Sequence, residues 1–242
     1  MDPAATPLLS VNSLSVSFGS RHVIQNLSFE IERGENLAIV GPNGSGKTVL
    51  LRTLLGMLPH TGSIRWASGV KLGYVPQSVA ADLQLPIFAA DLLAAKARIL
   101  KVPQDAIARA AAATATTPDM LTSRIGTLSG GQFQKILITF ALLGDPDVLL
   151  VDEPTASLDE LAEEHIYELL DRLRRERNLT VLLISHELSV IYQRATRVLC
   201  LSKNNPCFGK PQEILTPENL AEVYSSQPEF FHHLHNHAER PR

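Results

Sequence analysis

Residues 41–48 read Gly41-Pro42-Asn43-Gly44-Ser45-Gly46-Lys47-Thr48, which matches the phosphate-binding P-loop pattern. In such a loop the glycines let backbone N–H groups approach phosphates, and the following helix points its positive N-terminus at them. Lys47 can reach the β- and γ-phosphates, and the Thr48 hydroxyl can bind Mg²⁺. An ordinary glycine-rich turn is the alternative. Residues 37–40 suit a buried strand and residues 49–55 suit a helix, and this order of strand, loop and helix favours nucleotide binding.

Composition places the chain among packed globular proteins. It has 242 residues, 45% hydrophobic and 19% charged, which is enough for one large domain or two small ones. The net charge of −3 provides no general basic surface, so we expect no nucleic-acid partner. The longest apolar runs fall far short of the ~20 residues that span a bilayer, and the first residues lack the features of a signal peptide. We therefore expect a cytosolic protein, in which Cys200 and Cys207 are buried thiols.

Hydrophobic patterning predicts an α/β fold. Alternation over residues 9–17 and 23–32 indicates antiparallel strands. The alanine-rich residues 89–101 and 104–116 indicate helices, and we interpret the surrounding residues 86–123 as a helical subdomain inserted in an α/β core. Strands that alternate with helices elsewhere favour a parallel, largely buried sheet. The remaining strands are expected at 63–66, 71–75, 148–152, 180–184, 198–201 and 206–208, and the remaining helices at 131–143, 159–177 and 187–191.

The apolar residues 148–151 are followed by two carboxylates, Asp152 and Glu153. A buried strand that stops there places both acids at the carboxyl edge of a parallel sheet, where ligands bind in open α/β folds. The P-loop opens on the same edge, so Asp152 can serve the Mg²⁺ shell, as a Walker B aspartate does, and Glu153 can polarise an attacking water. Many strands end in charged residues at the surface for no functional reason, but the nearby P-loop favours the functional interpretation.

A second motif, Leu128-Ser129-Gly130-Gly131-Gln132, precedes a predicted helix. Glycine within a helix costs about 1 kcal/mol relative to alanine, so the paired glycines suggest that a backbone or an anion approaches closely. An ordinary N-cap explains Ser129 but not the glycines. A γ-phosphate held by this motif and by the P-loop, within one chain or across two, would make closure depend on ATP.

These motifs, together with Ser157-Leu158-Asp159 and His186 in the same order, resemble the ATPase subunit of an ABC transporter. The similarity covers about residues 8–209, and the Leu-Ser-Gly-Gly-Gln signature is highly specific to that family. The resemblance implies a P-loop NTPase with a RecA-like parallel sheet core, an N-terminal antiparallel β subdomain and an inserted α-helical subdomain. It implies ATP and Mg²⁺ as ligands. We expect one ATPase domain at residues 8–226, with the helical subdomain at about 86–125 and a histidine-rich tail at 227–242.

The resemblance also implies roles for single residues around the nucleotide. Phe18 would stack on adenine, although a core phenylalanine is the alternative. Gln77 would join the magnesium ligands, sense the attacking water and link to the transmembrane partner. His186 would contact the γ-phosphate. The expected catalytic residues are therefore Glu153, His186 and Gln77.

In that family the signature motif acts across a dimer. Residues 129–132 would contact the γ-phosphate of ATP held by a second copy of the chain, packed head to tail. Asp159 would lie in the loop that crosses the dimer, and a capping box over residues 157–160 is an alternative compatible with this role. Lys135 replaces the arginine that usually follows the signature, so the charge is kept but bidentate hydrogen bonding is lost.

Four of the eight histidines lie within six residues of the tail: His232, His233, His235 and His237. Histidine-rich tracts suit metal binding, and imidazole favours Zn²⁺, Cu²⁺ or Ni²⁺ over Mg²⁺ or Ca²⁺. A solvated tail without a role is the alternative. Residues 16–19, 72–77, 85–86 and 198–201 also resemble bacterial zinc-importing members of the family, although manganese and iron importers share much of this pattern. We hypothesise that the tail senses or buffers zinc.

The resemblance implies three partners: a second copy of the chain, an integral membrane permease and, indirectly, a metal-binding protein outside the membrane. The chain would act at the cytoplasmic face of the cell membrane, with residues 89–100 facing the permease. An ABC transporter ATPase for another solute is the nearest alternative. A soluble ABC-type ATPase acting on ribosomes or DNA usually has two cassettes or large extra domains, and a P-loop kinase does not need residues 128–132.

Overall fold

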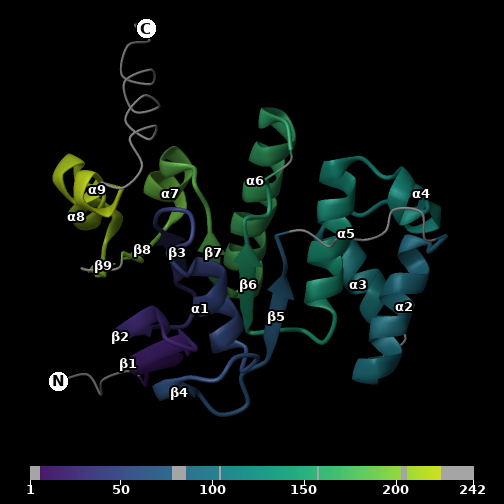
Figure 1. Cartoon of the computed structure of the whole chain (residues 1–242). Helices are drawn as coiled ribbons and strands as arrows, with labels where there is room; N and C mark the ends of the chain where they lie inside the picture. Colours follow the sequence, from purple (N-terminus) through teal and green to yellow (C-terminus); the bar gives the residue numbers. More distant parts are fainter. Residues whose placement is uncertain (1–5, 78–85, 104, 157, 203–205, 225–242) are drawn as a thin grey trace, which may run out of the picture.

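Two sheets and the helices that cover them make up the computed structural model, which describes residues 6–77, 86–103, 105–156, 158–202 and 206–224 (Figure 1). The strands are β1 (Leu9–Phe18), β2 (Arg21–Ile31), β3 (Asn36–Val40), β4 (Thr61–Trp66), β5 (Leu72–Val75), β6 (Val148–Asp152), β7 (Thr180–Ile184), β8 (Arg197–Cys200) and β9 (Cys207–Gly209). The helices are α1 (Lys47–Leu54), α2 (Ala89–Leu100), α3 (Ala106–Ala113), α4 (Pro118–Thr122), the 3₁₀ turn η1 (Ile125–Thr127), α5 (Gly130–Leu142), α6 (Glu160–Arg177), α7 (Leu188–Arg194), α8 (Pro211–Ile214) and α9 (Pro217–Val223).

The larger sheet has the strand order β5-β6-β7-β3-β8-β9, and all neighbouring pairs except β8 and β9 are parallel. Every residue of β3, β6 and β7 is buried, as expected for apolar strands covered on both faces. Parallel neighbours need crossover connections, so their carboxyl ends lie on one edge of the sheet. The loops that follow β5, β6, β7 and β3 therefore meet at that edge.

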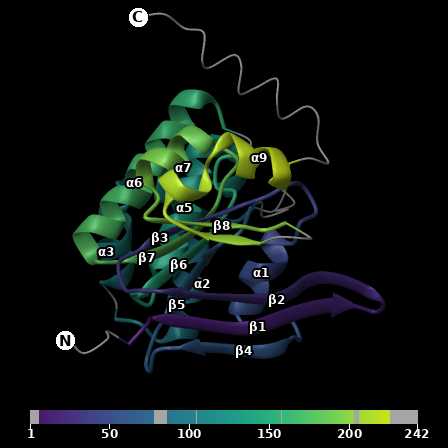
Figure 2. The same ribbon diagram turned by 90° about the vertical axis from the view of Figure 1, so that its left-hand side faces the viewer.

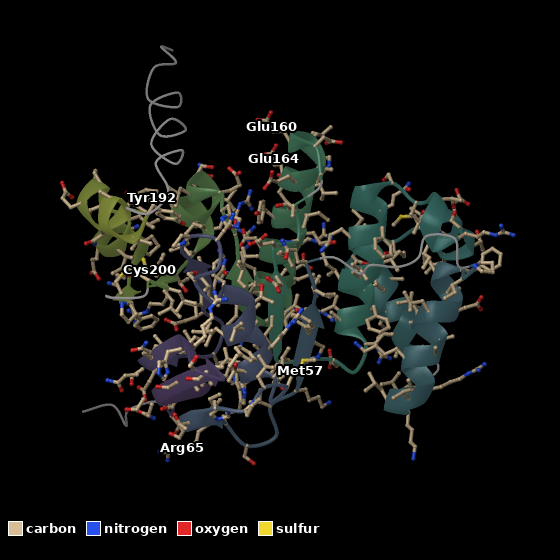
Figure 3. All side chains as sticks on the ribbon, in the orientation of Figure 1. Met57, Arg65, Glu160, Glu164, Tyr192 and Cys200 are labelled. Carbon is tan, nitrogen blue, oxygen red and sulfur yellow. The ribbon has the colours of Figure 1, made fainter. Side chains whose placement is uncertain are left out.

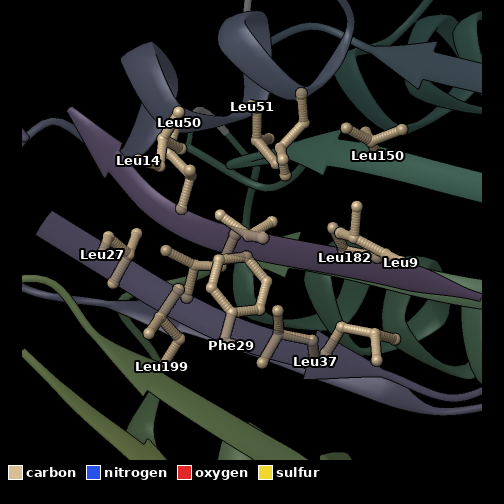
Figure 4. Close-up of a cluster of buried hydrophobic side chains, with 14 of the residues drawn as sticks. Leu9, Leu14, Leu27, Phe29, Leu37, Leu50, Leu51, Leu150, Leu182 and Leu199 are labelled. Carbon is tan, nitrogen blue, oxygen red and sulfur yellow. The ribbon is translucent and has the colours of Figure 1, made fainter. Parts of the chain in front are cut away.

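A smaller antiparallel sheet, in the order β2-β1-β4, packs on α1 and on one face of the larger sheet. Figure 2 shows these layers, with the small sheet on one side of the larger sheet and α5, α6 and α7 on the other. One apolar cluster joins the small sheet, α1 and the larger sheet (Figure 4); its labelled members are Leu9, Leu14, Leu27, Phe29, Leu37, Leu50, Leu51, Leu150, Leu182 and Leu199.

The opposite face of the larger sheet packs against α5 and α6 through a second apolar cluster, and α2 and α3 pack against α5. The hydroxyls of Thr114, Thr116 and Thr139 hydrogen-bond to one another at 2.7–2.9 Å and join the end of α3 to α5. Helices α2, α3 and α4 lie together at one side of the molecule (Figure 1) and fall within the predicted insertion at residues 86–125. The limits of that subdomain, and of a single domain at 8–226, remain predictions.

The predicted fold class, an α/β core with an antiparallel β subdomain and added helices, is confirmed. The differences lie at element boundaries and in two short elements, α4 and η1, that the patterns did not predict. α7 continues to Arg194, beyond the predicted end at residue 191, and β4 begins at Thr61 because it pairs with β1 over that length. No helix in the described ranges is long and apolar enough to cross a membrane.

Leu150 is fully buried in β6 and gives a test of the core. Leu150→Ala removes apolar contacts and leaves a cavity, so we expect the free energy of unfolding to fall by about 2–5 kcal/mol. Leu161→Ala is the matched control, because Leu161 of α6 is 66% exposed, and it should cost less than about 0.5 kcal/mol. Urea unfolding followed by circular dichroism measures both. Equal losses would contradict this placement of the core.

Candidate functional site

The P-loop connects β3 to α1, and steric crowding explains two of its glycines. Gly46 immediately precedes α1 with φ 102°, a backbone conformation that glycine adopts at little cost. Gly41 has φ 147°, and a Cβ there would lie 2.3 Å from the backbone oxygen of Leu201. The Leu201 N–H donates to Val40 O at 2.8 Å, which holds this stretch of chain beside β3. The residue after β8 therefore excludes any side chain at Gly41.

Lys47, the first residue of α1, is 6% exposed. Its Nζ donates to Gly41 O at 2.9 Å and to Pro42 O at 3.3 Å. Burial lowers the pKa of Lys47, and the charges of Glu153 and Asp152 oppose that shift. The bonded partners of this ammonium are neutral carbonyls, so a phosphate brought into the loop would stabilise its charge.

Asp152 ends β6 and is 1% exposed. Its Oδ1 accepts a hydrogen bond from Thr48 Oγ1 at 3.1 Å, and its Oδ2 accepts one from the Tyr74 hydroxyl at 3.3 Å. Burial raises the pKa of Asp152 because the charged form loses water, and the hydrogen bonds from Thr48 and Tyr74 oppose that shift. A buried carboxylate beside a hydroxyl supplies the hard oxygen ligands that Mg²⁺ prefers, so these residues fit that metal.

Glu153 follows with φ 44°, a left-handed conformation that costs a non-glycine residue roughly 1–2 kcal/mol. Its backbone N–H donates to Ile184 O at 3.1 Å. Its Oε1 lies 2.6 Å from His186 Nε2, and its Oε2 accepts from Gln77 Nε2 at 2.5 Å. The hydrogen bond with His186 lowers the pKa of Glu153 against the opposing effect of burial. The carboxylate therefore remains ionised at neutral pH and can act as a base.

These groups line one cleft of about 680 Å³ at the carboxyl edge of the larger sheet. Nine of the predicted site residues form its walls: Phe18, Asn43, Gly44, Gly46, Lys47, Thr48, Gln77, Glu153 and His186. Phe18 is 48% exposed, which argues against the alternative of a core phenylalanine. In the loop itself, Ser45 Oγ is buried and has no hydrogen-bond partner among the residues that the structure describes. The walls, the buried ammonium and this orphaned hydroxyl fit a bound nucleotide.

The signature motif lies away from the walls of this cleft. Ser129 caps α5: its Oγ accepts from Gln132 N at 3.3 Å, and its own N–H donates to Gln132 Oε1 at 3.0 Å. The N-cap interpretation of Ser129 is therefore correct, and Ser129, Gly130 and Gln132 are exposed. A Cβ at Gly131 would lie 3.4 Å from Ala162 Cβ, an ordinary contact. This neighbour within the chain does not require a glycine at Gly131.

Asp159 is also exposed and caps α6, because its side chain accepts from Ala162 N at 2.8 Å. The helix begins at Glu160, so a capping box that begins at residue 157 is wrong. Residue 157 itself lies outside the described residues. So does the tail at 227–242, which includes His232, His233, His235 and His237. Within the described part of the chain, no group of three or more His, Cys, Asp or Glu residues could hold a metal ion.

Five residues that the motifs did not identify also contribute to the site. Arg21 and Val23 of β2 and Val49 of α1 line the cleft. The predicted antiparallel strands were the signal that could have located the two β2 residues beside Phe18. The Tyr74 hydroxyl reaches Asp152 because β5 and β6 are parallel neighbours. The Tyr224 hydroxyl accepts from the Gly41 N–H at 3.2 Å, and burial raises its pKa to about 12. No local pattern reveals that contact.

Comparison with known proteins agrees with this geometry. The ABC transporter family matches residues 24–156. The zinc import ATP-binding protein ZnuC of Jannaschia sp. (strain CCS1) is 40% identical over 216 residues, which covers 88% of this chain and 87% of that protein. ZnuC of Yersinia enterocolitica is 36% identical over 236 residues, or 95% and 92% of the two chains.

Two solved structures share the fold. An inward-facing ABC transporter of the metal-chelate type has a TM-score of 0.82 at 28% identity and covers 91% of this chain and 90% of its own. CbiO1 from Clostridium perfringens, part of the ABC transporter complex CbiONQ, has a TM-score of 0.77 at 24% identity, with coverage of 95% and 99%. Family match, fold and site agree, and the chain belongs to the ABC transporter family as an ATP-binding subunit.

Proposed function

We propose that this chain is the ATP-hydrolysing subunit of an ABC importer for divalent metal, with zinc as the favoured metal. The observation that carries the ATPase activity is the cleft lined by Lys47, Thr48 and the Glu153–His186 pair. Asp152 lies behind it and is hydrogen-bonded to Thr48. The choice of zinc is supported by relatives named as zinc import proteins that align over most of the chain. An ABC transporter for another solute is the alternative.

Residues of the P-loop and of β6 would bind and orient the nucleotide. The loop N–H groups and Lys47 would hold the phosphates, and Phe18 would stack on the adenine. Thr48, Asp152 and Gln77 would hold Mg²⁺, which neutralises phosphate charge when bound. Because Gln77 contacts Glu153 rather than Asp152, its place among the metal ligands would require its side chain to turn.

Glu153 would orient and deprotonate the water that attacks the γ-phosphate. His186 lowers the pKa of Glu153 and contacts one of its oxygens at 2.6 Å, so it would keep the carboxylate ionised and aligned. Gln77 restrains the other oxygen. These contacts leave the base charged and fixed in place, which is the form that water activation needs.

A second copy of the chain would complete the site. Residues 129–132 do not line the cleft of their own chain, and three of the four are exposed. In a head-to-tail pair they would cover the phosphates held by the partner's P-loop, with Asp159 near the crossing. The exposed N-terminus of α5 would then face an anion, as helix dipoles favour. We further propose that the chain acts at the cytoplasmic face of the membrane. Its partners there would be a permease and, indirectly, a metal-binding protein outside the membrane.

Loss of this chain should reduce zinc uptake by cells grown with scarce zinc, and expression of the chain should restore it. Lys47→Ala should fail to restore uptake, because the variant loses the cation that binds phosphate. Uptake of zinc, manganese and iron is measured in the same cells. Loss of manganese or iron uptake alone would reassign the metal, and unchanged uptake of all three would contradict metal transport.

Glu153→Gln should slow ATP hydrolysis by about 10²–10⁴-fold, the usual contribution of a general base. The variant keeps the fold and the phosphate contacts, so ATP should accumulate unhydrolysed and trap a dimer. Phosphate release and the mass of the complex in light scattering measure the two effects. Glu176→Gln, at an exposed glutamate of α6, is the matched control and should behave as wild type. Normal turnover in Glu153→Gln would refute the role.

The tail hypothesis rests on His232, His233, His235 and His237 alone. Replacement of all four by alanine, or deletion of residues 227–242, should weaken the binding of Zn²⁺ and change the response of ATPase activity to added zinc. Isothermal titration with Zn²⁺ and an ATPase assay compare these variants with wild type. Equal zinc affinity and an equal ATPase response would show that the tail has no such role.

A further inference from the structure

Tyr167 lies between the two loops that carry Glu153 and His186. It belongs to α6, is 3% exposed, and its ring packs in the apolar cluster between α6 and the larger sheet. Its hydroxyl is 2.8 Å from Ser185 Oγ and 3.2 Å from Thr155 Oγ1. Ser185 immediately precedes His186, and Thr155 lies two residues after Glu153. One phenol therefore bonds to both strand-end loops.

The direction of this hydrogen-bond chain follows from its two ends. The Glu187 N–H can only donate, and it donates to Ser185 Oγ at 3.1 Å. The Glu163 carboxylate accepts from Thr155 Oγ1 at 2.8 Å. Each hydroxyl has one proton to give, so Ser185 donates to Tyr167 and Tyr167 donates to Thr155.

We propose that Tyr167 is a positioning residue for ATP hydrolysis, whose hydroxyl fixes the loop after β6 against the loop after β7 so that Glu153 and His186 stay in contact. The inference rests on the proposed ATPase function. Glu153 has a strained backbone conformation, and such conformations persist only where the surroundings enforce them. Its N–H bond to Ile184 O is one restraint, and the Tyr167 chain is a second.

Packing alone does not account for the hydroxyl. A phenylalanine ring would occupy the same apolar surroundings, whereas a buried phenol must find polar partners. Burial raises the pKa of Tyr167 to about 12, so the group stays protonated and donates throughout the physiological range. This series of hydrogen bonds also reaches Glu163, in the first turn of the helix that Asp159 caps. The restraint thus extends to the segment proposed to meet the second copy.

Tyr167→Phe removes one hydroxyl from this series of hydrogen bonds and leaves the aromatic ring in place. We expect kcat for ATP to fall about ten-fold, less than the ~100-fold that a misplacement of 1 Å can cause. KM for ATP should change less than about two-fold, because the P-loop contacts are untouched. In the Glu153→Gln background, Tyr167→Phe should slow hydrolysis no further, because the carboxylate that the hydroxyl positions is already gone. Steady-state kinetics of the full-length protein, in the single and double variants, measures all three.

Tyr192→Phe is the matched control, because Tyr192 of α7 is 53% exposed (Figure 3). Its hydroxyl does not belong to the series of hydrogen bonds through Tyr167. Its kcat and KM should equal those of wild type. Ser185→Ala breaks the same series of hydrogen bonds at its other end. It should reproduce the lower kcat and the nearly unchanged KM of Tyr167→Phe. The double variant should then be no slower than the slower single variant, since one restraint is already lost.

Hydrolysis by the wild-type chain in the same assay tests the proposed function separately. If wild type is active and folded Tyr167→Phe has the same kcat, the positioning role is overturned while the ATPase function stands. A further loss of kcat in the Glu153→Gln background, together with a lower unfolding temperature, would also overturn it, because a purely structural role predicts that result.

Discussion

The central strands β6, β7 and β3 are buried on both faces along their whole length. A polar side chain in the middle of such a strand would lose its water without gaining a partner, so polar chemistry is confined to the strand ends and to the residues that follow them. Because these strands are parallel, those residues collect at one edge of the sheet. Lys47, the adjacent pair Asp152 and Glu153, and His186 meet there, although these three positions are far apart in the sequence.

Asp152 and Glu153 are adjacent acids whose pKa values shift in opposite directions. Their surroundings, rather than their residue type, cause this difference. Asp152 is still part of its strand and bonds neutral hydroxyls, and burial raises its pKa. Glu153 directly follows the strand and itself has a left-handed backbone conformation. It contacts His186, and that hydrogen bond lowers the pKa of Glu153. The first suits a metal ligand that is completed by a cation, and the second suits a base that is already ionised. A single peptide bond joins the residues that serve these two functions.

Local sequence signals predicted most of the fold and the P-loop side of the site. The P-loop, the strand that ends at Asp152 and the cap at Ser129 depend on neighbours in sequence, so pattern and composition were sufficient. The contacts of Tyr224 with Gly41 and of Tyr167 with Ser185 depend on how distant elements pack, and no periodicity encodes them. The predicted capping box over residues 157–160 was wrong because Asp159 is itself the N-cap of α6 and accepts the hydrogen bond from Ala162 N.

The crowding at Gly41 bears on how the sequence of such a protein can change over evolutionary time. The usual explanation for this glycine is access of the backbone to phosphate. Here the carbonyl of Leu201 already occupies the space of a Cβ, so the glycine is required by the path of the chain after β8. A descendant that had lost its activity would be free to change Lys47 or Glu153 but would still retain Gly41. In such a lineage the glycine would record common ancestry and shared architecture, and only the lysine and the glutamate would report retained activity.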